Sequence, residues 1–250
     1  MSDAAPRNGT YPPLDVPKPV AEGVWVVDSG PQMLLGLPFP VRMTVLRLGD
    51  GGLWLHSPTR YTGPLGEAIR ALGPVRHLVS PGTGHWVHLP SWQRHFPEAR
   101  VWAPDGVSER AAAAGLLLGP HGRLGAAAPA AWAGQIAQDM LRGWGFVEIA
   151  FHHAPSGTLV LTDTVQAMET HRLPLAAALY ARAMGTAAPV GGAPRPVRLL
   201  MRRHAAANRE AAARLLALAP ERVIFAHGAF FAEDGAERLR NSWRWLLRGR

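Results

Sequence analysis

The stretch that decides the fold runs from residue 146 to residue 163 and reads Phe-Val-Glu-Ile-Ala-Phe-His-His-Ala-Pro-Ser-Gly-Thr-Leu-Val-Leu-Thr-Asp. Residues 146–151 follow the alternating pattern of a strand, and the Pro-Ser-Gly turn leads into a second apolar run. This pattern predicts a β-hairpin. The hairpin places one histidine, His153, at its turn and one carboxylate, Asp163, at the end of its second strand.

Strands and helices are predicted on both sides of this hairpin. The first half of the chain contains a strand over 23–28, a hairpin over 43–56, a helix over 64–72, a strand over 75–80, a helix over 91–96 and a strand over 99–103. The second half contains helices over 173–183, 208–219 and 234–247 and a strand over 221–226. Strand-turn-strand units in both halves, with helices between them, predict a two-sheet α/β sandwich. Two segments rich in Ala, Gly and Pro, 111–133 and 185–196, are predicted to be loops.

The composition limits the class of protein. A length of 250 residues with 48% hydrophobic and 18% charged residues fits one folded domain over 1–250, in which 1–13 is an extended, proline-rich lead-in. No apolar run approaches the roughly 20 residues that span a bilayer, and residues 1–13 lack the apolar core of a signal peptide. We therefore expect a cytoplasmic protein without a transmembrane segment.

Arginine dominates the basic residues, and the formal net charge is +8. The arginines gather over 195–209 and 238–250, an arrangement that allows an acidic protein partner. The alternative is that the enrichment is purely compositional, because Ala, Gly and Pro are abundant as well. Sequence-specific nucleic-acid binding is disfavoured, since the basic segments lack interleaved aromatic residues and the frame of a recognition helix.

Metal-ligating side chains follow several of the predicted strands. Because the chain has no cysteine, a metal site must use His, Asp or Glu. The candidates are His85 with His88, His153, Asp163 and His227. A fold that gathers strand ends would bring imidazoles and a carboxylate around one cation. The alternative is structural: these side chains could cap a turn or hold a hairpin together.

Their order resembles the metallo-β-lactamase superfamily. His153-Ala154-Pro155-Ser156-Gly157 resembles its middle His motif, Leu161-Thr162-Asp163 its bridging-Asp strand, and Phe225-Ala226-His227-Gly228 its last His motif. Ser57-Pro58-Thr59 stands where the superfamily has an Asp-Thr-Gly-like turn. The resemblance implies an αββα sandwich of two mixed sheets flanked by helices. It points to an uncharacterised branch, a domain-of-unknown-function family.

The chain departs from the superfamily at the first His motif. There the family has His-x-His-x-Asp-His, whereas this chain has Pro81-Gly82-Thr83-Gly84-His85-Trp86. Pro81 and Thr83 replace the first two histidines, and His85 falls at the position of the aspartate. A two-metal centre is therefore disfavoured. His85, His153, Asp163 and His227 still form a single-metal set, with His88 as a substitute or as a supporting hydrogen-bond donor.

Two functions from different classes follow from this set. The first is a metallo-hydrolase-like protein in which one divalent ion, Zn or Fe, activates water against a small ester or amide. The second is a metal-free, catalytically degenerate relative that binds a ligand or serves as an assembly subunit. A third possibility is redox or oxygen chemistry at an iron ion, since His and Asp ligands do not distinguish zinc from iron.

Overall fold

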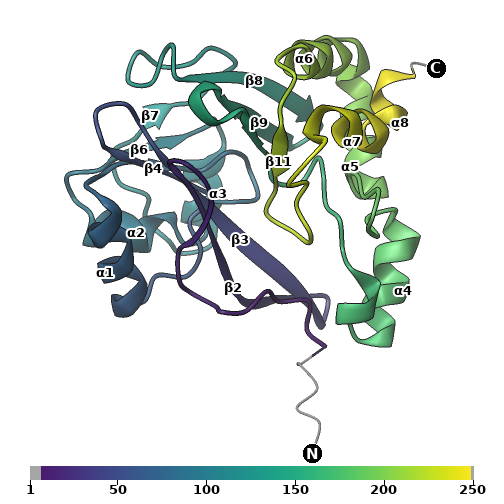
Figure 1. Ribbon diagram of the computed structural model, residues 1–250, viewed down its shortest axis with the longest axis horizontal. Coiled ribbons are helices and arrows are strands. Elements are labelled where there is room, and N and C mark those ends of the chain that lie inside the picture. The colour runs from purple at the N-terminus through teal and green to yellow at the C-terminus, as the bar shows by residue number, and fades with distance from the viewer. Residues whose placement is uncertain (1–6, 249–250) are drawn as a thin grey trace, which may run out of the picture.

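Two β-sheets lie face to face, and helices cover both outer faces (Figure 1). The computed structural model describes residues 7–248. The predicted two-sheet α/β sandwich flanked by helices is thus confirmed. Residues 1–6 of the predicted N-terminal lead-in lie outside the described residues.

The first sheet contains seven strands in chain order. Its first four strands pair antiparallel, and the remaining neighbours pair parallel. The strands are β1 (Lys18–Ala21), β2 (Val24–Leu34), β3 (Leu37–Arg47), β4 (Leu53–His56), β5 (Val75–Val79), β6 (Arg100–Ala103) and β7 (Gly122–Arg123).

The second sheet contains four strands in the order β11-β10-β9-β8. The central pair β9 (Phe146–His153) and β10 (Thr158–Val160) is the hairpin predicted from residues 146–163. On one side it pairs antiparallel with β8 (Ile136–Gly143), and on the other side parallel with β11 (Arg222–Ile224). The strand β8 is not evident in the sequence, because Gln138, Asp139 and Arg142 interrupt its apolar pattern.

Aromatic and branched side chains from both sheets form the layer between them. Trp54 of β4 meets Phe151 of β9 edge to face, with ring centroids 4.8 Å apart, and Trp132 packs against the same indole. All three side chains are fully buried. Large rings of this kind bury the most apolar area per residue, so this layer fixes how the sheets face one another.

The outer faces are covered by two separate groups of helices. Leu65 and Ile69 of α1 and Trp92 of α2 pack on the first sheet. Leu215 of α6 and Trp243, at the end of α7, pack on the second sheet. The α-helices of the described residues are α1 (Gly63–Leu72), α2 (Leu89–His95), α3 (Val107–Ala113), α4 (Leu175–Met184), α5 (Arg195–Met201), α6 (Ala205–Ala217), α7 (Gly235–Ser242) and α8 (Arg244–Leu247). Three short 3₁₀ turns are η1 (Ala154–Ser156), η2 (Thr170–Arg172) and η3 (Arg202–His204).

Several predicted boundaries change. The first strand predicted, 23–28, extends to Leu34, and the hairpin predicted over 43–56 begins earlier, at Leu37. The single helix predicted over 234–247 is divided into α7 and α8. The predicted loop 111–133 includes the end of α3 and the strand β7. Within residues 7–248, no helix has both the length and the apolar character needed to cross a bilayer.

Candidate metal centre

Three of the predicted metal ligands meet at one edge of the sandwich. His85 lies in the loop after β5, Asp163 follows β10, and His227 follows β11. One donor atom from each lies within 4.8 Å of the donors of the other two. The strands β10 and β11 run parallel, so the segments that follow them leave the sheet at the same edge. This geometry brings Asp163 and His227 together although 64 positions separate them.

The donor atoms are evenly spaced. The Nε2 atom of His85 lies 3.3 Å from Oδ2 of Asp163 and 3.3 Å from Nε2 of His227. The Nε2 atom of His227 lies 3.4 Å from Oδ1 of Asp163. Ligands about 2.0–2.1 Å from a tetrahedral zinc ion are about 3.3–3.4 Å from one another. Two imidazoles and a carboxylate at this spacing fit a mononuclear site for zinc or iron.

Hydrogen bonds behind the two imidazoles hold their orientation. The Nδ1–H of His227 donates to the carbonyl oxygen of Pro40 over 2.8 Å, which leaves Nε2 of that ring without a proton when the ring is neutral. The Nδ1 atom of His85 lies 2.7 Å from the hydroxyl of Ser57. Ser57 has a left-handed backbone conformation with φ of 54°, which is uncommon for a residue other than glycine. Such conformations cluster at functional sites.

A buried carboxylate holds the loop that carries Asp163. Glu148 of β9 accepts hydrogen bonds from the backbone N–H groups of Thr162, Asp163 and Thr164 and from the Thr164 hydroxyl, over 2.7–3.0 Å. The side chain of Gln166 donates to Oδ1 of Asp163. Glu148 was not among the predicted site residues. Its only signal in the sequence is an acidic residue within an apolar strand.

Electrostatic effects separate the three pKa values. Burial opposes ionisation of Asp163, but His85 and His227 outweigh it and hold the pKa of Asp163 well below its usual value. Burial also opposes protonation of His85, and the Asp163 carboxylate outweighs it, so the pKa of His85 is raised. For His227 burial prevails, and its pKa is lowered. At neutral pH the site therefore contains an ionised Asp163 and a neutral His227.

His153, the fourth ligand predicted from the sequence, lies away from this group of three. The Phe146 end of β9 faces the site, because Gly82 bridges to Glu148 there. His153 is at the other end of the strand, five residues further on. At about 3.3 Å per residue, the five residues from Glu148 to His153 span about 16 Å along the strand. His153 instead faces Ser156 in the hairpin, with 2.8 Å between its Nδ1 and the hydroxyl oxygen.

The first His motif is replaced by contacts between backbone segments. The Ile149 N–H donates to the Pro81 carbonyl, and the Thr83 N–H donates to the Val147 carbonyl. A Cβ atom on Gly82 would collide with that same Val147 carbonyl. The strand β9 therefore lies directly against residues 81–83. This segment includes Pro81 and Thr83, which stand where the first His motif of the superfamily has its first two histidines. His88 also stays outside the three-residue group, with its Nε2 3.2 Å from the side-chain nitrogen of Gln32.

A cavity of about 260 Å³ opens beside the three donors. His85, Asp163 and His227 form one wall, and Ser57 and Thr59 lie beside them. The β2–β3 hairpin supplies Gln32, Met33, Leu34, Phe39, Val41 and Arg42, and the β5–α2 loop supplies Gly84 and Val87. Pro58 and Gln166 come from the segments after β4 and β10. This mixture of apolar and polar groups next to ionisable residues is typical of a small-molecule site.

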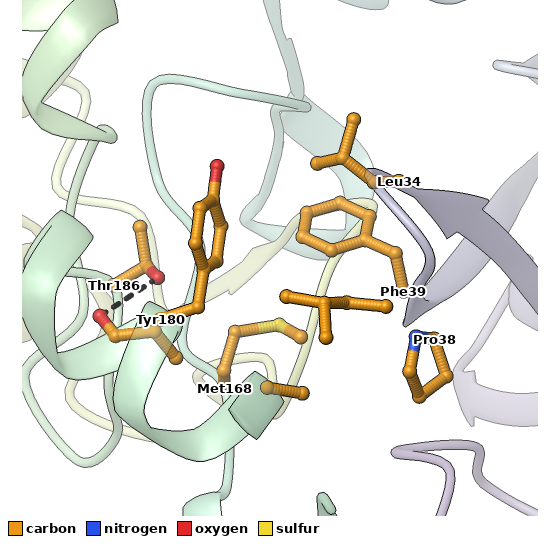
Figure 2. A pocket seen from close by; sticks show the side chains of 9 residues that line it. Leu34, Pro38, Phe39, Met168, Tyr180 and Thr186 are labelled. Atoms are coloured by element: carbon orange, nitrogen blue, oxygen red, sulfur yellow. Dashed lines mark hydrogen bonds between the residues drawn. The ribbon is translucent and has the colours of Figure 1, made fainter.

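Phe39 separates this cavity from a smaller apolar one. Its ring lies 4.4 Å from the ring of His227, and it also lines the second cavity, together with Met168 and Tyr180 (Figure 2). The second cavity has a volume of about 10 Å³. Roughly this volume is needed for one water molecule. We interpret it as a packing gap between the hairpin and α4, which supports the wall behind His227.

Comparisons with solved structures place the fold. The FIM-1 metallo-β-lactamase of Pseudomonas aeruginosa, in a mono-zinc form, is similar over 93% of this chain and 95% of its own, with 13% identity and a TM-score of 0.63. A metallo-β-lactamase from Pontibacter korlensis is similar over 94% and 99%, with 13% identity and a TM-score of 0.59. Rubredoxin oxygen:oxidoreductase of Desulfovibrio gigas is similar over 93% of this chain and 61% of its own, with 14% identity and a TM-score of 0.65.

The protein therefore has the metallo-β-lactamase fold, as its motifs predicted. Residues 21–198 match the domain of unknown function DUF4336, and the chain belongs to that family. The predicted membership in a domain-of-unknown-function family is thus confirmed. A comparison with curated proteins finds no match.

Proposed function

We propose that the protein is a metal-dependent, hydrolase-like enzyme in which His85, Asp163 and His227 hold one divalent ion, zinc or iron. The observation that carries this proposal is the even spacing of 3.3–3.4 Å among their donor atoms at the wall of a cavity. When bound, such an ion supplies Lewis-acid chemistry, which polarises a carbonyl group and lowers the pKa of water from about 16 towards 7.

The other residues of the site position these three donors. Pro40 and Ser57 hold the two imidazoles from behind, and Glu148 fixes the backbone around Asp163. Hydrogen-bonded supports of this kind orient metal ligands, and their removal typically lowers metal affinity 10–100-fold. Because they are present in the protein itself, the donor geometry does not depend on an ion to assemble it.

The cavity fits a small substrate. Its volume of about 260 Å³ lies near the lower end of the range for ligand pockets, about 300–1,000 Å³. Met33, Leu34 and Phe39 offer apolar contacts on one side, and the ionisable group lies on the other. A short ester or amide, with its carbonyl towards Asp163 and an apolar substituent towards the hairpin, matches this division.

The metal-free alternative is supported by the contacts among the three side chains themselves. If His85 is protonated, it pairs with the Asp163 carboxylate, and the three groups satisfy one another without an ion. In that case the protein binds a ligand in the same cavity without catalysis.

Metal analysis separates the two functions. The untagged protein is grown with zinc and iron, and its metal content is measured beside His227→Ala and Asp163→Asn. His153→Gln tests the residue that the sequence placed in the site, and His171→Ala controls for exposed histidines. We expect about one equivalent of metal in the wild type and both controls, and a loss in the two site variants. No metal in any of them, together with an unchanged melting temperature after chelation, would support the metal-free function.

A hydrolysis assay on the metal-loaded protein follows. Chromogenic esters and amides are turned over by the wild type and not by Asp163→Asn, if the proposal is correct. One equivalent of metal without hydrolysis would leave the site assignment in place and direct the assay to oxygen reduction, since a structural relative is an oxygen:oxidoreductase.

A further inference from the structure

A groove of about 960 Å³ lies among the C-terminal helices α5, α6, α7 and α8. Figure 1 shows how these helices are arranged. It shares no lining residue with the cavity beside His85. Five arginines line it, and no Asp or Glu does: Arg198, Arg202, Arg209, Arg244 and Arg248. We call this hollow the arginine groove.

The charges of the arginine groove are not neutralised within the protein. Among residues 7–248, none of its five arginines forms an ion pair with a carboxylate. Elsewhere on the surface, Arg123 and Arg214 each pair with an aspartate, so acidic partners are available to other arginines of this chain. Burial and the neighbouring Arg195 lower the pKa of Arg198, because its charge is partly desolvated and repelled. An anion in the groove would relieve both effects.

The protein holds one of these arginines in place. The guanidinium of Arg198 donates to the carbonyl oxygens of Ala193 and Gly185, and it lies over the ring of Trp245, with 5.5 Å from Cζ to the ring centroid. Guanidinium groups are planar forks of donors that match the oxygens of a phosphate. A group held in place before binding loses less conformational entropy when it binds.

The walls of the groove also offer an apolar surface. Trp245, Met201, Leu246 and Val190 lie among the arginines. The indole Nε1 of Trp245 and the Nε of Arg209 are buried donors without an acceptor among residues 7–248. A ligand that combines several anionic oxygens with a flat, apolar body would match both kinds of wall.

We infer that the arginine groove binds a phosphate-bearing small molecule of nucleotide size. Its volume lies near the upper end of the range for ligand pockets, about 300–1,000 Å³, and it suits a ligand that carries two or three phosphates on an aromatic body. This inference goes beyond the proposed hydrolase function and does not depend on it, because the two sites have separate linings.

Calorimetric titration with ATP tests the inference. ATP is the probe for a nucleoside triphosphate, and adenosine is its uncharged counterpart. The titration is made with excess EDTA and no magnesium, so that a metal ion cannot bind the phosphates. We expect ATP to bind, adenosine not to bind, and His227→Ala to bind ATP as the wild type does.

Two double variants provide the matched comparison. Arg202→Ser with Arg244→Ser removes two charges from the groove, whereas Arg203→Ser with Arg240→Ser removes two exposed charges that do not line it. We expect the first to weaken ATP binding about tenfold or more and the second to leave it unchanged, where tenfold corresponds to about 1.4 kcal/mol. Equal weakening in both would show general charge attraction and overturn the inference. Absence of ATP binding would also overturn the inference, as would binding of single-stranded RNA without binding of ATP.

Discussion

Replacing Glu148 with glutamine tests the support beneath the candidate metal centre. Glu148 is 1% exposed, and its two carboxylate oxygens accept hydrogen bonds from three backbone N–H groups and one hydroxyl. In Glu148→Gln one of these oxygens becomes an NH₂ group, which is a donor facing donors. Depending on the orientation of the amide, one or two backbone N–H groups lose their acceptor.

The magnitude follows from these contacts. A buried N–H without an acceptor costs about 1–3 kcal/mol. The substitution also removes a buried charge. Burial and the nearby Asp163 raise the pKa of Glu148, so its ionised form is disfavoured, and losing the charge offsets part of the cost. We therefore expect Glu148→Gln to lower the free energy of unfolding by about 2–4 kcal/mol.

Equilibrium unfolding in urea measures this change at neutral pH. The matched control is Glu67→Gln on α1, where the side chain is 76% exposed. We expect the control to stay within about 0.5 kcal/mol of the wild type, as surface substitutions usually do. A Glu148→Gln variant as stable as this control, with unchanged zinc affinity, would refute the idea that Glu148 holds the loop of Asp163.

Further predictions concern the surroundings of the site and the pH dependence. Arg42, 3% exposed, pairs with a buried aspartate and donates to the carbonyls of Phe225 and Gly228, on either side of His227. Arg42→Gln should lower the free energy of unfolding by about 3–5 kcal/mol, measured in urea; a change below about 1 kcal/mol would contradict the role given to this ion pair. Burial lowers the pKa of His77 from 6.5 to about 4, and its Nδ1 accepts a hydrogen bond from an indole. The unfolded chain takes up this proton first, so stability falls as pH drops from 6.5 towards 4. With allowance for solvent screening, the wild type should lose about 1 kcal/mol more than His77→Gln between pH 7 and pH 5. Equal losses in the two proteins would refute this.

The sequence predicts much of this architecture because its signals are local. The hairpin 146–163, the strand ends before His85 and His227 and the helix on residues 64–72 all follow from periodicity and turn residues. The strand β8 does not, because its polar residues make contacts that only the folded chain provides. Asp139, for example, pairs with Arg214 of α6.

In the candidate site, too, local sequence patterns do not predict positions that depend on contacts distant in sequence. A sequence places His153 at the end of a strand, but which end of β9 faces the site depends on its pairing with residues 81–83. Motif order therefore names Asp163 and His227, which the structure brings together, whereas His153 lies at the opposite end of β9 from this group. Ser57, Pro40 and Glu148 were not evident as supports, because each acts through a contact distant in sequence or through the backbone.

The measurement that tests the central claim most directly is anomalous diffraction at the zinc edge from crystals grown with zinc. We predict one anomalous peak about 2.0–2.2 Å from Nε2 of His85, a carboxylate oxygen of Asp163 and Nε2 of His227. In crystals of His153→Gln the peak should be unchanged. A peak beside His153, or none at the three-residue group in zinc-soaked crystals, would contradict the assignment.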